Sequence, residues 1–166
     1  MLNKDDFSAL AHSRRSTRDF LPDLVSDADL AAVLEDGMSA PSWSNTRPFM
    51  FAIATGDQRD RISAALVARL QENAEVPGMG MNPDYTHETP YPPGLIERSQ
   101  RVGKGIYDTL GIDRADKESR FRFMQRNYEF FGAPVALFFF AHRGLGHFGT
   151  LDLGLFMEAA DRRAHV

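Results

Sequence analysis

The chain has 166 residues, 43% of them hydrophobic and 25% charged, which is typical of one globular domain and excludes a disordered or fibrous chain. Its net charge is −4 and no stripe of Lys and Arg runs through it, which argues against nucleic acid as a partner. The sequence contains no cysteine, so disulfides, thiolate metal sites and cysteine nucleophiles are excluded.

Two helices are predicted near the start of the chain. The first covers residues 5–13, and a basic segment follows it. Ser26 is typical of a helix N-cap, because its hydroxyl can accept a hydrogen bond from a backbone N–H of the first turn. The helix that it starts is predicted to end near Gly37, and its apolar face carries Leu30, Val33 and Leu34.

A loop, a strand and a third helix are predicted next. Pro41 and Pro48 punctuate the loop, because proline interrupts regular structure. The short apolar run at residues 49–54 predicts a buried strand, and residues 60–72 have the apolar spacing of a helix.

Residues 76–94 are rich in proline and glycine and predict a long loop. Loops of this length inside a domain are usually functional or disordered. We interpret this one as a mobile loop beside a small-molecule pocket, with Tyr85 and Tyr91 near that pocket, and a disordered surface loop is the alternative.

The last part of the chain predicts two helices, a strand and a final helix. The helices cover residues 95–110 and 116–131. The run at residues 133–141 is apolar almost throughout, which favours a central strand covered on both faces. The final helix is predicted at residues 150–160. Without repeats or a linker, residues 1–166 are expected to form a single domain.

Targeting and metal signals are absent from the sequence. Residues 1–20 are charged and lack the apolar stretch of a signal peptide, and the longest apolar run is too short to cross a bilayer. We therefore expect a cytoplasmic protein that does not bind membranes. The five histidines do not have the spacing of metal ligands, so no metal site is expected.

One candidate binding cluster follows the first helix. Its residues are Arg14, Arg15, Ser16 and Arg18. Guanidinium groups match the oxygens of a phosphate, and a hydroxyl adds a neutral donor, so the cluster is suited to a phosphate and a flat anionic ring. A solvated basic turn is the alternative interpretation.

A second candidate cluster lies between two prolines and contains the only tryptophan of the chain. An aromatic face in a constrained loop suits stacking on a flat ligand, and the small polar residues around it suit hydrogen bonds to ring edges. A packed loop with an anchoring tryptophan is the alternative. The candidate residues are Pro41, Ser42, Trp43, Ser44 and Asn45.

In combination, these motifs resemble the flavin-dependent nitroreductases and the related flavin-dependent dehalogenases. The order is Arg-Arg-Ser-x-Arg at residues 14–18, then Ala-Pro-Ser-x-x-Asn-x-x-Pro at residues 40–48. Residues 126–135 are similar to the family's entry into its central strand, and residues 151–156 to the start of its long central helix. Residues 103–112 resemble the subgroup that reduces nitroaromatic acids.

The resemblance implies an α+β fold with three layers, in which helices surround a mostly antiparallel central sheet. The strands at residues 49–54 and 133–141 should both belong to this one sheet. It also implies FMN as the cofactor. Arg14 and Ser16 would hold the phosphate and ribityl chain, with Arg15 close by, and Arg18 would lie beside flavin N1 and O2. The family's site lies between two subunits of a homodimer, so residues 41–45 would reach the flavin that is bound mainly by the partner subunit.

The implied activity is that of an oxidoreductase. Two electrons would pass from NAD(P)H to a nitroaromatic, quinone or similar small organic acceptor, without a side-chain nucleophile. The resemblance also implies that this chain is short at its C-terminus relative to the family. A truncated, non-catalytic protein of the same fold, or a weak flavin-binding subunit, is therefore the alternative function, and dehalogenation or oxidation of a saturated bond is a third.

Overall fold

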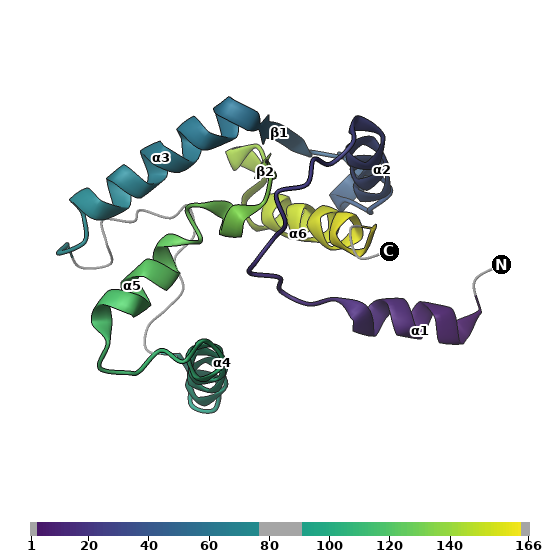
Figure 1. Ribbon diagram of the computed structural model, residues 1–166. Coiled ribbons are helices and arrows are strands. Elements are labelled where there is room, and N and C mark those ends of the chain that lie inside the picture. Colours follow the sequence, from purple (N-terminus) through teal and green to yellow (C-terminus); the bar gives the residue numbers. More distant parts are fainter. Residues whose placement is uncertain (1–2, 77–90, 164–166) are drawn as a thin grey trace. The chain divides into compact units, whose positions relative to one another are not determined.

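The computed structural model describes residues 3–76 and 91–163 (Figure 1). They form two compact units: Met1–Asp60 together with Gly132–Val166, and Arg61–Phe131. The expectation of a single domain stays a prediction. In chain order the elements are α1 (Lys4–Ser13), α2 (Asp27–Met38), the 3-10 turn η1 (Trp43–Asn45), β1 (Met50–Thr55), α3 (Gly56–Glu72), α4 (Leu95–Leu110), α5 (Lys117–Gln125), η3 (Phe130–Gly132), β2 (Val135–Phe140), η4 (Arg143–Leu145) and α6 (Gly146–Arg163).

The first unit is built on the pairing of β1 with β2. The two strands run antiparallel, from Met50 opposite Phe140 to Thr55 opposite Val135. The expectation that both apolar runs belong to one sheet is therefore confirmed. Because side chains alternate between the faces of a strand, Phe51 and Phe139 lie opposite each other on the same face.

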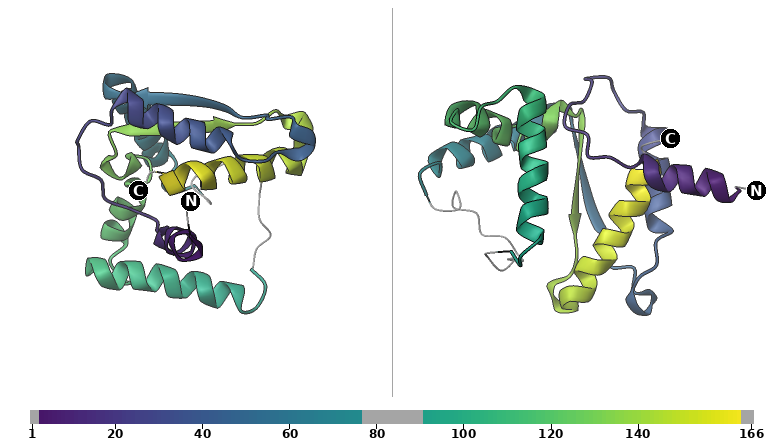
Figure 2. Two further views of the ribbon diagram at one scale, coloured as in Figure 1. Left: turned by 90° about the vertical axis from the view of Figure 1, so that its right-hand side faces the viewer. Right: turned by 90° about the horizontal axis from the view of Figure 1, so that it is seen from below.

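Helix α6 packs on that face, and α2 packs beside α6 (Figure 2). The Phe156 ring of α6 is fully buried, with its centroid 4.9 Å from that of Phe49 and 5.4 Å from that of Phe139. Ala40 and Ala160 complete the buried cluster. The partly buried side chains packed around this core are Val33, Leu34, Met38, Phe49, Phe139 and Ala159.

The coverage of the two strands differs from the expectation. In β1 only Ala54 is buried, so the expected buried strand is wrong for most of its length. β2 is mostly half-buried, with Ala136 buried, and does not have the full cover on both faces that was expected. The physical reason is that each strand pairs only with the other among the described residues, and the aromatic contacts of α6 concentrate on one face.

The second unit consists of α4, α5 and most of α3. The Tyr107 ring of α4 meets Phe123 of α5 edge-on at 5.9 Å, and the Arg120 guanidinium lies 4.8 Å from the Tyr107 centroid. Ser63 of α3 donates its hydroxyl proton to the backbone carbonyl of Tyr128 at 3.0 Å. These contacts connect the three helical segments through α5 and the turn that follows it.

Several element boundaries agree with the sequence, whereas α3 and α6 each begin four residues before the predicted start and α5 ends early. The Ser26 hydroxyl accepts from Asp29 N, as an N-cap should, and α4 covers the predicted residues 95–110. The helix predicted at residues 116–131 ends instead at Gln125, and it could not have reached residue 131 because Phe130 and Phe131 have positive φ angles that a right-handed helix cannot contain. Most of the predicted loop at residues 76–94, including Tyr85, lies outside the described residues.

In the described part of the chain, none of the helices combines the length and the apolar composition needed to cross a bilayer.

Gly37 permits the close approach of α2 to α6. A Cβ atom at this position would lie 2.7 Å from Cζ of the buried Phe156 ring, well inside normal contact distance. We expect Gly37→Ala to lower the free energy of unfolding by about 1–3 kcal/mol, because the ring cannot move without disturbing the core. Chemical denaturation with the fluorescence of Trp43 as the probe measures this.

Gly154→Ala is the matched control for that substitution. Gly154 lies within α6, and a Cβ atom there would meet nothing within 4 Å. The substitution should raise the free energy of unfolding by about 0.5–1 kcal/mol through the helix preference of alanine. Equal effects of the two substitutions would contradict the packing described for Gly37.

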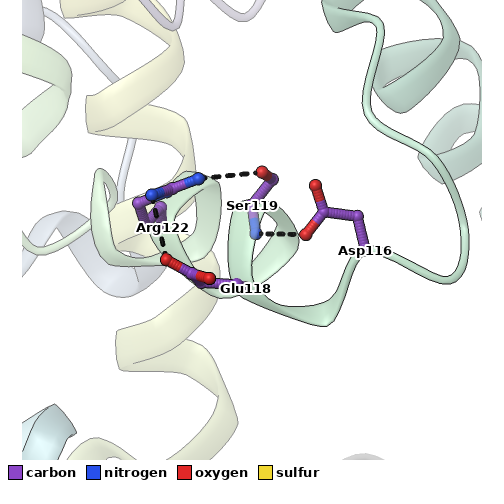
Figure 3. A network of polar contacts seen from close by, with 4 residues as sticks. All are labelled: Asp116, Glu118, Ser119 and Arg122. Carbon is purple, nitrogen blue, oxygen red and sulfur yellow. Dashed lines mark hydrogen bonds and ion pairs between the residues drawn. The ribbon is translucent and has the colours of Figure 1, made fainter.

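Helix α5 begins with a polar network around Asp116 (Figure 3). Its carboxylate is the N-cap and accepts from Ser119 N at 2.9 Å, while Arg122 contacts Glu118 at 3.1 Å and the Ser119 hydroxyl at 3.0 Å. The Ser119 backbone N–H, then its hydroxyl, and to a smaller extent the charge of Arg122 lower the pKa of Asp116 below its ordinary value of 3.8.

The stability contributed by Asp116 should therefore depend on pH. A lowered pKa in the folded state means that this contribution is fully present above pH 3.8 and is lost as the pH falls through the lower folded value. Asp116→Ala should destabilise the protein at neutral pH and progressively less in acid, measured as urea midpoints at several pH values. Asp116→Asn keeps a cap without a titrating charge, so its difference from Asp116→Ala should stay constant with pH.

Candidate functional site

The arginine cluster lies in an extended segment directly after α1. Arg14 ends that helix with φ −57° and ψ 130°, and the four candidate side chains are exposed. Arg18 donates from Nη1 to the backbone carbonyl of Ser16 at 3.3 Å. In residues 3–76 and 91–163, neither Arg14, Arg15 nor Arg18 forms an ion pair with a carboxylate. Three guanidinium groups are thus accessible to an anion.

The loop that contains Trp43, residues 41–48, is called the tryptophan loop below. It is a tight turn closed by its own polar groups. Asn45 N donates to Ser42 O at 3.0 Å, and the hydroxyl of Thr46 donates to Trp43 O at 3.0 Å. Arg47 closes the far end, since its backbone N–H donates to the Ser42 hydroxyl at 2.8 Å and its Nε to Asn45 Oδ1 at 3.2 Å. The loop therefore has a defined conformation rather than being only an irregular connection between prolines.

This conformation is unfavourable for the residues that adopt it. Ser44, Asn45 and Arg47 have φ angles of 51°, 54° and 44°, in the left-handed region that favours glycine. Such angles cost on the order of 1–3 kcal/mol each and persist only where surrounding contacts fix them. Among the five candidate residues of the loop, the side chains of all but the half-buried Ser42 are exposed.

The contact that anchors this loop comes from a distant helix. Trp43 donates its backbone N–H to both carboxylate oxygens of Asp152 in α6, at 3.0 and 3.2 Å. Asp152 is only 2% exposed. The sequence places this residue within a helix motif, and it was not predicted as a site residue. An acidic residue flanked by leucines on both sides was the available signal.

The Trp43 ring stacks on the ring of Phe148, which like Asp152 belongs to α6. Its centroid lies 4.3 Å from that of Phe148, with an angle of 19° between the ring planes. The two residues remain 56% and 46% exposed, so the stack lies at the surface. Phe148 also was not predicted as a site residue, because nothing in the local sequence links it to a loop about a hundred residues earlier.

The two candidate clusters are not brought into contact within the chain. No hydrogen bond, ion pair or ring contact of the described residues joins residues 14–18 to residues 41–45. Their assignment to a common ligand therefore stays a prediction for both groups.

Comparison with known proteins identifies the family. The sequence model described as the nitroreductase family matches residues 11–160. The chain is 32% identical to 4-nitrobenzoate reductase of Pseudomonas putida over 93% of this chain and 65% of that protein. It is 34% identical to nitrobenzene nitroreductase of Ectopseudomonas oleovorans, over 90% and 64%. It thus spans about 65% of the length of these curated relatives.

Solved structures agree with this assignment. The FMN-dependent nitroreductase NfnB from Mycobacterium smegmatis, in complex with NADPH, superposes with a TM-score of 0.85 at 28% identity, covering 95% of this chain and 68% of that one. The FMN- and NADPH-dependent NfnB of Sphigopyxis sp. strain HMH gives 0.86 at 32% identity, covering 94% and 69%. The expected α+β nitroreductase fold is confirmed, and the chain belongs to the nitroreductase family.

Proposed function

We propose that this protein is an FMN-dependent oxidoreductase that passes two electrons from NAD(P)H to a nitroaromatic, quinone or similar organic acceptor. The observation that carries the proposal is the pair of exposed clusters, one cationic and one aromatic, in a chain of the nitroreductase family. The solved relatives at 28% and 32% identity are FMN-dependent enzymes.

The chemistry of the two clusters fits this cofactor. FMN has a phosphate and a flat ring system, and the arginine segment offers exposed guanidinium groups without carboxylate partners in the described part of the chain. Arg14, Arg15 and Ser16 would hold the phosphate and ribityl chain. Arg18 would lie beside the pyrimidine edge of the ring, where a cation favours the negative charge that accompanies reduction.

The tryptophan loop would serve the flavin held by a partner subunit. Pro41 and Trp43 present apolar surface, and Ser42, Ser44 and Asn45 present hydrogen-bonding groups. When bound, FMN would supply the two-electron chemistry, so the tasks of this chain are to bind, orient and shield the reacting molecules. No side chain needs to act as a nucleophile.

A homodimer is part of the proposal. Helix α6 buries Phe156 but leaves Leu151 and Leu155 exposed four residues apart, which places them along one side of the helix. Burying such a stripe against a second copy would remove apolar surface from water. The same association would bring the tryptophan loop of one subunit to the arginine segment of its partner.

Nitroaromatic compounds are the first acceptors to test. Two curated relatives are described as reductases of 4-nitrobenzoate and of nitrobenzene. NADPH is the first electron donor to test, because it is the nucleotide named for both NfnB enzymes.

The function is tested on the purified protein. We expect FMN absorption that survives desalting, a sedimentation mass of twice 18.6 kDa and NADPH oxidation that depends on a nitroaromatic acceptor. A colourless protein that does not bind added FMN would contradict the proposal and favour a non-catalytic member of the fold. A protein that holds FMN but is not reoxidised by any nitroaromatic or quinone would be a flavin-binding subunit.

The roles of the two outer arginines can be separated. Arg18→Ala should weaken FMN binding about tenfold to a hundredfold, equivalent to roughly 1.5–3 kcal/mol, and should also lower the reduction potential of the bound cofactor. Arg14→Ala should weaken binding with little change in potential, because the phosphate lies far from the redox centre. Fluorescence titration measures the FMN affinity. Redox equilibration with reference dyes measures the reduction potential of the bound cofactor.

Arg69→Ala is the matched control for both substitutions. Arg69 is an exposed arginine at the end of α3 that contacts Glu72 at 3.3 Å. Its removal should leave both quantities unchanged. If Arg18→Ala and Arg14→Ala behave like this control, the arginine cluster is a solvated turn and the proposed phosphate site is wrong.

A further inference from the structure

The tryptophan loop lacks the local cap that its sequence offers. Ser42 occupies the N-cap position of η1 in extended conformation, yet its hydroxyl makes no capping hydrogen bond within the turn. That hydroxyl instead accepts from Arg47 N at the far end of the loop. The first N–H of η1, on Trp43, is satisfied by the Asp152 carboxylate. The backbone donor at the start of the turn is therefore satisfied by a residue 109 positions away.

The position of this carboxylate is fixed by the core. Phe148, Asp152 and Phe156 are spaced four residues apart, which places them along one face of α6. Phe156 is fully buried against the sheet and α2, so the rotation of α6 about its axis is determined by packing. The same face then presents Asp152 to the backbone of Trp43 and Phe148 to its ring.

The loop needs such a support. It combines three non-glycine residues of positive φ with a single 3-10 turn, and such short turns have little stability of their own. A buried carboxylate that accepts from a backbone N–H forms one of the stronger hydrogen bonds available in a protein. Burying the Asp152 carboxylate without a hydrogen bond would cost free energy, and the Trp43 N–H supplies that hydrogen bond.

We propose that Asp152 is a positioning residue for the candidate flavin site: it fixes the tryptophan loop in the conformation that meets the cofactor, and Phe148 fixes the plane of the Trp43 ring. The part of this inference that concerns FMN rests on the proposed function. The part that concerns the loop does not, because Trp43 is the only tryptophan and reports on its own surroundings.

Two substitutions of Asp152 test the proposal in the full chain. Asp152→Ala removes the acceptor, and Asp152→Asn keeps the shape and one carbonyl oxygen without the charge. Phe148→Leu supplies the reference spectrum of a Trp43 that has lost its stacking partner. Tryptophan emission and near-ultraviolet circular dichroism are recorded without cofactor, and FMN dissociation constants are measured separately. Far-ultraviolet circular dichroism shows which variants are folded.

Ser63→Ala is the matched control. Ser63 is also buried and polar, and it donates to Tyr128 O within the Arg61–Phe131 unit. Its replacement should lower stability while leaving the Trp43 spectrum and FMN affinity unchanged. A general loss of stability is thereby separated from a specific effect on the loop.

Both in Trp43 emission and in FMN affinity, Asp152→Asn should lie between wild type and Asp152→Ala. The emission of Asp152→Ala should shift in the direction of Phe148→Leu, and its FMN dissociation constant should rise about tenfold, the factor that corresponds to a hydrogen bond with a charged group. Asp152→Asn should recover part of both changes. If Asp152→Ala does not fold, the intermediate spectrum and affinity of Asp152→Asn decide the question.

Three results would overturn the inference. One is a wild-type spectrum in folded Asp152 variants. Another is an Asn variant that differs from wild type as much as the Ala variant, since the retained acceptor would then have no role. The third is an altered spectrum with unchanged FMN affinity, which would limit Asp152 to the structure of the loop. If wild type itself binds no FMN, the proposed function fails, and the spectra still decide whether Asp152 holds the loop.

Discussion

The close contact between Gly37 and Phe156 is the constraint on which the first unit depends. Because Gly37 has no side chain, the backbone of α2 reaches the Phe156 ring, and that ring occupies the space between α2 and the strands. The contact determines which face of α6 points inward. Asp152 and Phe148 take their places one and two turns before Phe156 as a consequence. The arrangement of the tryptophan loop at the surface therefore depends on the packing of Phe156 in the core.

The sequence predicted what depends on neighbouring residues and missed what depends on distant ones. The cap at Ser26 and the bounds of α4 followed from local composition and spacing, whereas the placement of both apolar strands in one sheet followed from the fold that the resemblance implies. The end of α5 did not, since the positive φ angles of Phe130 and Phe131 leave no mark in residue type. The exposed side chains of β1 and the role of Asp152 were likewise hidden, because both are set by segments far away in the chain. The candidate residues of the site came from resemblance to a family, and the geometry adds two that a local pattern does not identify.

The two candidate clusters differ in how firmly their conformation is fixed, and so in the conformational entropy that each would lose when a ligand binds. The tryptophan loop is tied at both ends and anchored to a buried carboxylate, so little conformational entropy remains for a ligand to remove. The arginine segment is extended and exposed, and the hydrogen bond within it is local. Side chains of this kind lose more freedom when they close on an anion. One side of the proposed site is thus preorganised, and the other would be completed by the ligand itself.

The pairing of β1 with β2 also bears on how the chain folds. The partners are separated by the whole Arg61–Phe131 unit, and the ring that seals them lies still later, at Phe156. Contacts between residues so distant in sequence form only after a long loop has closed, and this closure costs conformational entropy. Folding is therefore slower than for a helical bundle of equal length. In the helical unit, in contrast, the contact of Tyr107 with Phe123 joins residues close in sequence and can form early. On the ribosome, β1 therefore cannot pair until β2 has been synthesised, and the core around Phe156 cannot form until α6 follows.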